Sequence, residues 1–166
     1  MPASKTMTIL MALLVAGSVT ACAIIEPGDD EPTIDELLAA PLTIDLGGKT
    51  LRLTTAMWRD FQPISPPDGK PLIAVFYVMT TDSTEFPAGV RFDHAWVVLE
   101  RQVWSTGFTG EERPPSEQLS WQQVEVARNG PRFGPGVTAE AVVRVRDADG
   151  ETCLLRATDQ PIERTD

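Results

Sequence analysis

The octapeptide "LIAVFYVM", Leu72 to Met79, decides the fold class of this 166-residue chain. It is apolar at odd and even positions alike and rich in β-branched and aromatic residues. This composition favours a strand buried on both faces over an amphipathic helix. Turn-forming sequences border it, with "PPDGKP" at 66–71 and "TTDSTEFPAG" at 80–89. We therefore expect a central β-strand with a chain reversal at each end.

Outward from this strand, apolar residues alternate with polar ones in both directions along the chain. The segment "LTIDLGGKTLRL", residues 42–53, alternates around Gly47-Gly48, a pair that supplies the positive φ of a tight hairpin. The segment "VTAEAVVRVR", residues 137–146, also alternates, and "DADG" then reverses the chain into "ETCLLRA", with "PIER", residues 161–164, as a possible short edge segment. About seven to nine short strands with frequent turns predict an all-β fold, an antiparallel β-sandwich.

The predicted arrangement of residues 42–164 resembles the immunoglobulin-like and fibronectin-like sandwiches. The resemblance is architectural and rests on no specific motif, because the Cys…Trp…Cys spacing of immunoglobulin domains is missing. It implies two packed sheets with loops clustered at their ends. A small barrel is the alternative.

The N-terminal segment has the order of parts of an export signal. Lys5 is followed by an uncharged stretch, residues 7–19, that is shorter than the roughly 18 residues of a membrane-spanning helix. The tetrapeptide Val19-Thr20-Ala21-Cys22 resembles the lipobox of bacterial lipoprotein precursors. That resemblance implies cleavage after Ala21, a diacylglyceryl group on the Cys22 thiol and acylation of its new amine. An uncleaved anchor and an ordinary secretory signal are the alternatives.

This interpretation divides the chain into three parts. They are a signal peptide (1–21), the lipidated cysteine with an acidic tether and a possible short helix (22–41), and the sandwich (42–166). The signal for that helix is the capping-box spacing of Thr33 and Glu36; more tether is the alternative. Several acyl chains on Cys22 would hold the domain firmly at a lipid bilayer, whereas one chain binds marginally. We expect a location in the bacterial cell envelope, facing the periplasm or the exterior. In a host with two membranes, Ala23 favours the outer one.

The charge of the chain limits its partners. Lys and Arg number 14 and Asp and Glu 24, which gives a formal net charge of −10. Such a surface disfavours nucleic acid. Besides the bilayer, the expected partner is an envelope protein that the sequence does not identify. No cofactor is expected.

The sequence contains no catalytic constellation that we recognise. His94 is the only histidine, and one histidine with the single remaining thiol of Cys153 does not make a usual zinc site. Nothing marks a serine nucleophile, since a Gly-x-Ser-x-Gly elbow is missing. Asp147, Asp149 and Glu151 hint at calcium, but Asp-x-Asp-Gly is also ordinary turn chemistry. We therefore expect no enzyme, no metal site and a hairpin turn, with a hydrolase kept as an alternative.

One loop stands out as a candidate binding site. The segment "RNGPRFGPG", residues 128–136, is shaped by glycine and proline, and Arg132 and Phe133 could project from its tip. The alternative is that Phe133 folds back as a plug on the end of the domain. The long connection 105–119 is a second candidate. Together these features predict a membrane-anchored lipoprotein with a non-enzymatic binding or assembly domain. The alternative is a calcium-binding adhesion or structural module.

Overall fold

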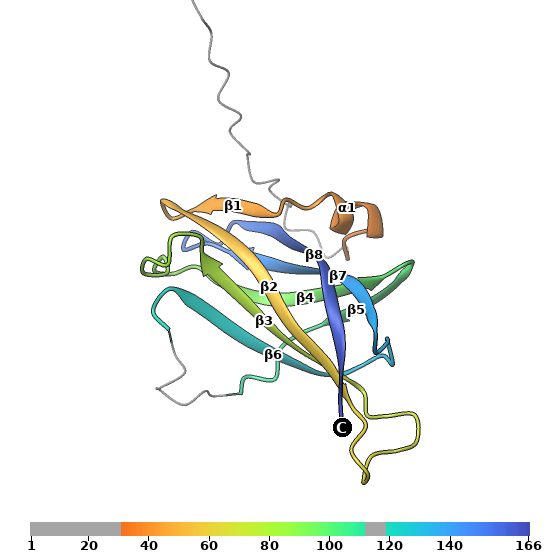
Figure 1. The fold of residues 1–166 in the computed structure, drawn as a ribbon. Helices are drawn as coiled ribbons and strands as arrows, with labels where there is room; N and C mark the ends of the chain where they lie inside the picture. The colour runs from red at the N-terminus through yellow and green to blue at the C-terminus, as the bar shows by residue number, and fades with distance from the viewer. Residues whose placement is uncertain (1–30, 112–118) are drawn as a thin grey trace, which may run out of the picture.

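The computed structural model describes residues 31–111 and 119–166, which form one helix and eight strands (Figure 1). In chain order these are α1 (Ile34–Ala39), β1 (Thr43–Leu46), β2 (Lys49–Asp60), β3 (Leu72–Thr80), β4 (Arg91–Leu99), β5 (Gln102–Thr106), β6 (Gln122–Gly130), β7 (Val137–Arg146) and β8 (Thr152–Thr165).

Two local predictions are confirmed near the start of the described chain. Thr33 caps α1, because its side chain accepts the amide of Glu36 while the Glu36 carboxylate accepts the amide of Thr33. Gly47 and Gly48 both adopt positive φ and make the turn between β1 and β2. Both features depend only on residues that are close in sequence.

The strands form a single mixed sheet, so the prediction of a two-sheet, immunoglobulin-like sandwich is wrong. Seven strands follow the order β5-β4-β7-β8-β2-β3-β6, and β1 pairs additionally with β2. The pairs in this order are antiparallel except that of β2 with β8, which runs parallel from Met57 beside Ile162 to Asp60 beside Thr165. This parallel pair joins strands that a sandwich would divide between two sheets.

The physical reason for the error lies in β8. Alternation of side chains reports which residues face a core, but not which strands pair. The segment "PIER" is not a short edge segment of its own, because residues 161–164 continue the 14-residue β8. A register shift opposite Ala139 and Ala141 adds one residue to β8, and Asp159 there has a φ of 54°. Such a bulge bends the strand, which allows its second half to reach β2.

The sheet is strongly curled into a half-barrel, and its concave face encloses the main core (Figure 1). Fully buried members of this core include Phe76 of β3, Val143 of β7 and Leu155 of β8. Phe108, which follows β5, packs edge-on against Phe76 and Phe92, with ring centroids 5.7 and 5.2 Å apart. Aromatic side chains thus fill the open side of the curl.

The two ends of the sheet approach each other. Trp104 of β5 lies so close to Gly130 of β6 that a Cβ there would be 2.7 Å from the indole ring. The amide of Thr109 also donates to the Val126 carbonyl at 2.9 Å. The segment after β5 therefore covers part of the free edge of β6.

A smaller apolar cluster lies on the convex face, where α1 packs against β4, β7 and β8. It contains Leu37 and Ala40 together with Trp96, Val98, Val142 and Leu154. In Figure 1, α1 lies at the top of the domain and the loop between β2 and β3 at the bottom. The first described residues, 31–39, therefore lie at the end opposite this loop.

Candidate functional site

Two loops come together at the end of the domain away from α1 (Figure 1). Residues 61–71 connect β2 to β3, and residues 131–136 connect β6 to β7. We call them the distal loop pair. The second includes Arg132 and Phe133, the two residues that the sequence singles out.

Arg59 of β2 holds the distal loop pair together from inside. Its side chain is buried, with 4% of the residue exposed. The guanidinium donates to the carbonyls of Asp68 and, at 3.0 Å, of Lys70 in the first loop. It also donates to the carbonyls of Gly134 at 2.7 Å and Arg132 at 3.3 Å in the second. Burial, and after it the charge of Arg132, lower the pKa of Arg59.

Further contacts clamp the first loop where it leaves the sheet. The Lys70 ammonium lies 2.6 Å from the Asp60 carboxylate, which also accepts the amide of Gln62 at 2.9 Å. These hydrogen bonds, that of Lys70 first, lower the pKa of Asp60. The Phe61 ring lies 5.1 Å from the guanidinium carbon of Arg59 and 4.2 Å from that of Arg164. Cation–π contacts of this kind stabilise the position of the ring.

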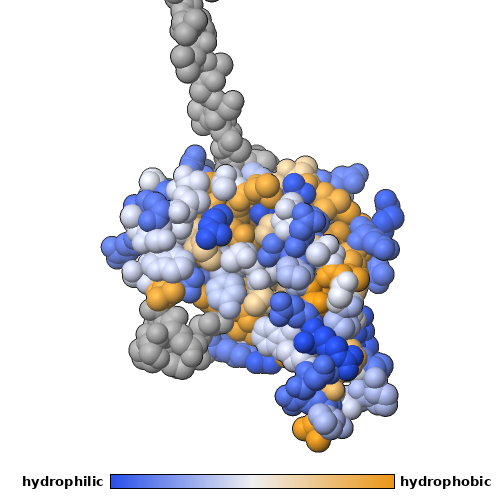
Figure 2. Space-filling view, in the orientation of Figure 1, coloured by the Kyte–Doolittle hydropathy of each residue, from blue (hydrophilic) through white to orange (hydrophobic). Residues whose placement is uncertain are grey.

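The clamped loop presents one isoleucine to solvent. Ile64 is 87% exposed, whereas the next most exposed large hydrophobic residue in the described ranges, Leu42, is 49% exposed. Pro63, Pro66 and Pro67 surround Ile64 and restrict the backbone. Figure 2 shows this loop as a mostly hydrophilic projection with a hydrophobic tip. A single exposed apolar side chain is ordinary on a protein surface, so the significance of Ile64 depends on what adjoins it.

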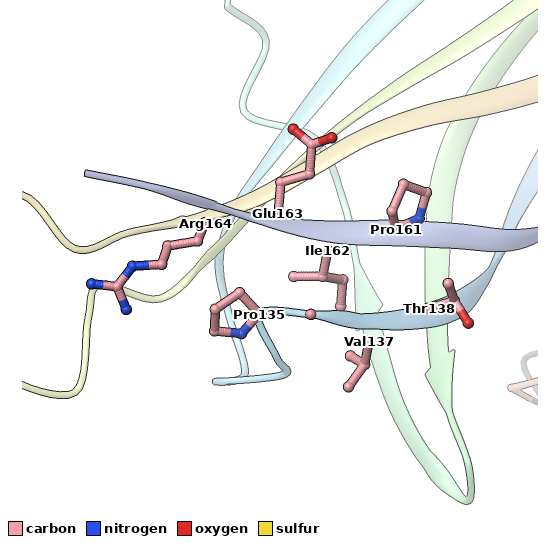
Figure 3. A pocket seen from close by; sticks show the side chains of 8 residues that line it. Pro135, Val137, Thr138, Pro161, Ile162, Glu163 and Arg164 are labelled. Atoms are coloured by element: carbon pink, nitrogen blue, oxygen red, sulfur yellow. The ribbon is translucent and has the colours of Figure 1, made fainter.

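An open groove of about 540 Å³ lies at the same end of the molecule (Figure 3). It is lined by residues 135–138 and by residues 161–164 of β8, and the side chains of Glu163 and Arg164 point in different directions. Because Arg164 also stacks on Phe61, the groove adjoins the first loop.

The two predicted residues of the second loop have different surroundings. The side chain of Arg132 is 51% exposed and forms an ion pair with Asp68 of the first loop. Phe133 is only 5% exposed and belongs to the main core, which matches the plug that the sequence left as the alternative. Sequence reasoning missed Arg59, Phe61 and Ile64. An isoleucine within "QPISPPDGKP" was the available signal for the last of these.

The acidic residues near 147 form a hairpin turn. The Asp147 carboxylate accepts the amides of Asp149 and Glu151, both at 2.9 Å. In the described part of the chain, no group of three or more His, Cys, Asp or Glu side chains is arranged to hold a metal ion. Turn formation accounts for the observed contacts of Asp147.

His94 belongs to a polar cluster on the convex face. Its Nε2 lies 2.8 Å from the Ser105 hydroxyl, which hydrogen-bonds the Glu31 carboxylate, and Trp96 Nε1 donates to the same carboxylate at 2.7 Å. In a catalytic triad the acid orients the imidazole. Here the Glu31 carboxylate contacts Ser105 instead of His94. These contacts hold Glu31 against the sheet and do not activate a nucleophile.

Cys22 and Ala21, the predicted lipidation and cleavage residues, lie outside the described residues, as does part of the connection 105–119. We found no helix in residues 31–111 and 119–166 that is long and apolar enough to cross a membrane. Comparison of the chain with family models, with curated proteins and with solved structures found no match.

Proposed function

We propose that this chain is a membrane-anchored cell-envelope lipoprotein whose domain binds a partner protein through the distal loop pair. The observation that carries the proposal is Ile64, an isoleucine 87% exposed on a loop that buried Arg59 holds in place. The chemistry is recognition rather than catalysis. The partner needs an apolar pocket that accepts a branched aliphatic side chain.

The clamped loop favours binding because its shape exists before the partner arrives. A loop that must become ordered on binding loses affinity through conformational entropy, and preorganisation removes that loss. The charged groups around Ile64 are paired, Lys70 with Asp60 and Arg132 with Asp68. Paired charges leave the apolar tip and the adjoining groove as the main source of affinity, with weak dependence on salt.

The anchor is proposed from the sequence and is consistent with the layout of the domain. The described chain begins at Glu31, near α1, and the distal loop pair lies at the other end (Figure 1). An anchor at acylated Cys22 would therefore attach at the opposite end of the domain from the loops and leave them accessible to a partner. The acidic composition disfavours nucleic acid as the partner.

Site-specific photo-crosslinking in the native organism tests the contact. A photoreactive residue in place of Ile64 should give one discrete adduct, whereas the same residue in place of Leu42, at the anchor end, should not. The Ile64→Asp substitution should abolish pull-down of that partner, and Ile64→Val should retain it. Equal crosslinking at both positions would refute the assignment.

Membrane extraction tests the anchor separately. The mature protein should partition into the detergent-rich phase and carry the intact mass of an acylated Cys22. The Cys22→Ser variant should leave that phase. If the variant stays there as firmly as the wild type, the anchor is not at Cys22.

A further inference from the structure

We propose that residues 31–41, which we call the strap, form a releasable segment that keeps part of the tether docked on the domain. Docked, the strap shortens the reach of the domain from its anchor. Lifted, it lengthens that reach while the sheet stays folded. The change in reach rests on the proposed anchor at Cys22, whereas the release does not.

The first end of the strap is held by polar contacts. The Glu31 carboxylate accepts hydrogen bonds from Trp96 Nε1, at 2.7 Å, and from the Ser105 hydroxyl. His94 supports both partners, because its Nε2 lies 2.8 Å from Ser105 Oγ and its ring centroid lies 4.7 Å from that of Trp96. Glu31 is itself exposed, so water can replace these contacts.

The other end of the strap is held by Arg156 of β8. Its Nε donates to the Ala40 carbonyl at 3.1 Å, and its backbone amide donates to the Pro41 carbonyl at 2.8 Å. Between the two ends, Leu37 is fully buried against the convex face. Leu37 is thus the main apolar contact that release must break.

The strap can leave without unfolding the sheet. Its residues belong to the convex cluster and not to the concave core. No strand pairing of the sheet passes through residues 31–41. The six-residue α1 is far shorter than an isolated stable helix, so it depends on docking for its structure. These are the properties of a segment that opens locally at lower free energy than the whole domain.

Release changes the reach of the domain considerably. Glu31 lies nine residues after Cys22, so the tether to a docked strap spans at most about 30 Å. After release, the first fixed residue is near Leu42, 20 residues after Cys22, and the limit rises to about 70 Å. One domain could then meet partners at two distances from the bilayer.

Amide hydrogen exchange on the full mature protein in detergent tests the release. The amides of Leu37 and Ala40 should exchange at least 100-fold faster than the central amides of β7 and β8. Glu31→Gln should accelerate exchange of the strap amides about tenfold, because a charge-assisted hydrogen bond is lost, and leave β7 unchanged. Asp35→Asn, a matched change at an exposed residue of α1, should have little effect. Strap amides that exchange together with β7 would overturn the proposal.

A second measurement separates the reach from the anchor. With the protein bound to vesicles, energy transfer from a dye at position 64 to a lipid dye should fall in the double variant Glu31→Gln, Leu37→Ala. Unchanged transfer would overturn the change in reach. A protein that fails to bind vesicles would overturn the proposed anchor and the reach with it, while hydrogen exchange would still decide the release.

Discussion

At Arg59 the chain buries a guanidinium whose hydrogen bonds within the described residues all go to main-chain carbonyls. Carbonyl dipoles replace part of the lost water but supply no countercharge. An apolar side chain of similar length would fill the same space without this penalty. Only the planar guanidinium group, however, has enough donors in a fixed arrangement to bind the carbonyls of both loops at once. We infer that Arg59 determines the shape of the distal loop pair more than the stability of the domain.

Substitution of Arg59 tests this inference. Arg59→Lys keeps a buried charge but leaves some of the loop carbonyls without a donor, and we expect it to lower the free energy of unfolding by about 1–3 kcal/mol. Arg59→Met removes the charge and should cost less. Both should speed exchange of the Gly69 and Lys70 amides, which now donate to Pro66 and Asp60. Urea unfolding measures the loss of stability, and hydrogen exchange measures the order of the loop. If the loop amides of the variants stay as protected as in the wild type, the inference about Arg59 is wrong.

Acid should destabilise the folded domain through two residues. Burial first, and then the charge of Arg144, lower the pKa of His94, while Glu31 and Asp93 oppose them. Hydrogen bonds from Ser105 and Trp96 lower the pKa of Glu31. The unfolded chain therefore binds more protons than the folded one. The stabilisation is complete above the ordinary pKa of each group, 6.5 for His94 and 4.5 for Glu31, and is lost as the pH falls below it.

A pH series of thermal unfolding checks this expectation. The melting temperature should fall between pH 7.5 and 5.5, by an amount that corresponds to less than about 1 kcal/mol. His94→Gln should flatten the curve in this interval and leave the steeper loss below pH 4.5. Parallel curves for the variant and the wild type would show that His94 does not titrate with folding.

At the scale of elements, the sequence predicts what neighbouring residues determine. The capping box of α1, the turn at Gly47-Gly48 and the interior position of β3, paired with β2 and β6, are all confirmed. The single sheet, the length of β8 and its parallel pairing with β2 were not predictable. Neither was the link from Arg59 to Gly134, which spans 75 residues. Alternation of apolar and polar residues defines which face of a strand is buried, whereas the pairing of strands depends on the whole chain.

The approach of β5 to β6 can be tested with two glycines. A methyl group at Gly130 would lie 2.7 Å from the Trp104 ring, while nothing lies within 4 Å of the same position at Gly107. We expect Gly130→Ala to destabilise the domain by about 1–3 kcal/mol through overpacking, and Gly107→Ala to have little effect. Urea unfolding of both variants measures the difference. Equal stabilities would mean that the ends of the sheet are not in contact.

At the scale of the whole molecule, the fold separates an anchor end from a contact end. The strap, which includes α1, lies at the first end, and the distal loop pair with its adjoining groove lies at the second (Figure 1). The sheet between them is one continuous body, because β2 and β8 join its two halves. A rigid connection of this kind keeps the distal loops at a constant distance from the convex face on which the strap docks.

The join between β2 and β8 carries the last prediction. Ile162 lies opposite both Met57 of β2 and Val137 of β7, and only 1% of it is exposed. In a sandwich in which residues 161–164 form a separate edge segment, truncating Ile162 would disturb that edge alone. In the single curled sheet, truncating Ile162 opens a cavity where the two halves of the sheet meet. Ile162→Ala should therefore cost about 2–5 kcal/mol and speed exchange in β2, β7 and β8 together. Glu163→Ala, its exposed neighbour, should cost less than about 0.5 kcal/mol. Faster exchange confined to residues 160–166 would show that this strand is peripheral and that the sheet does not close through it.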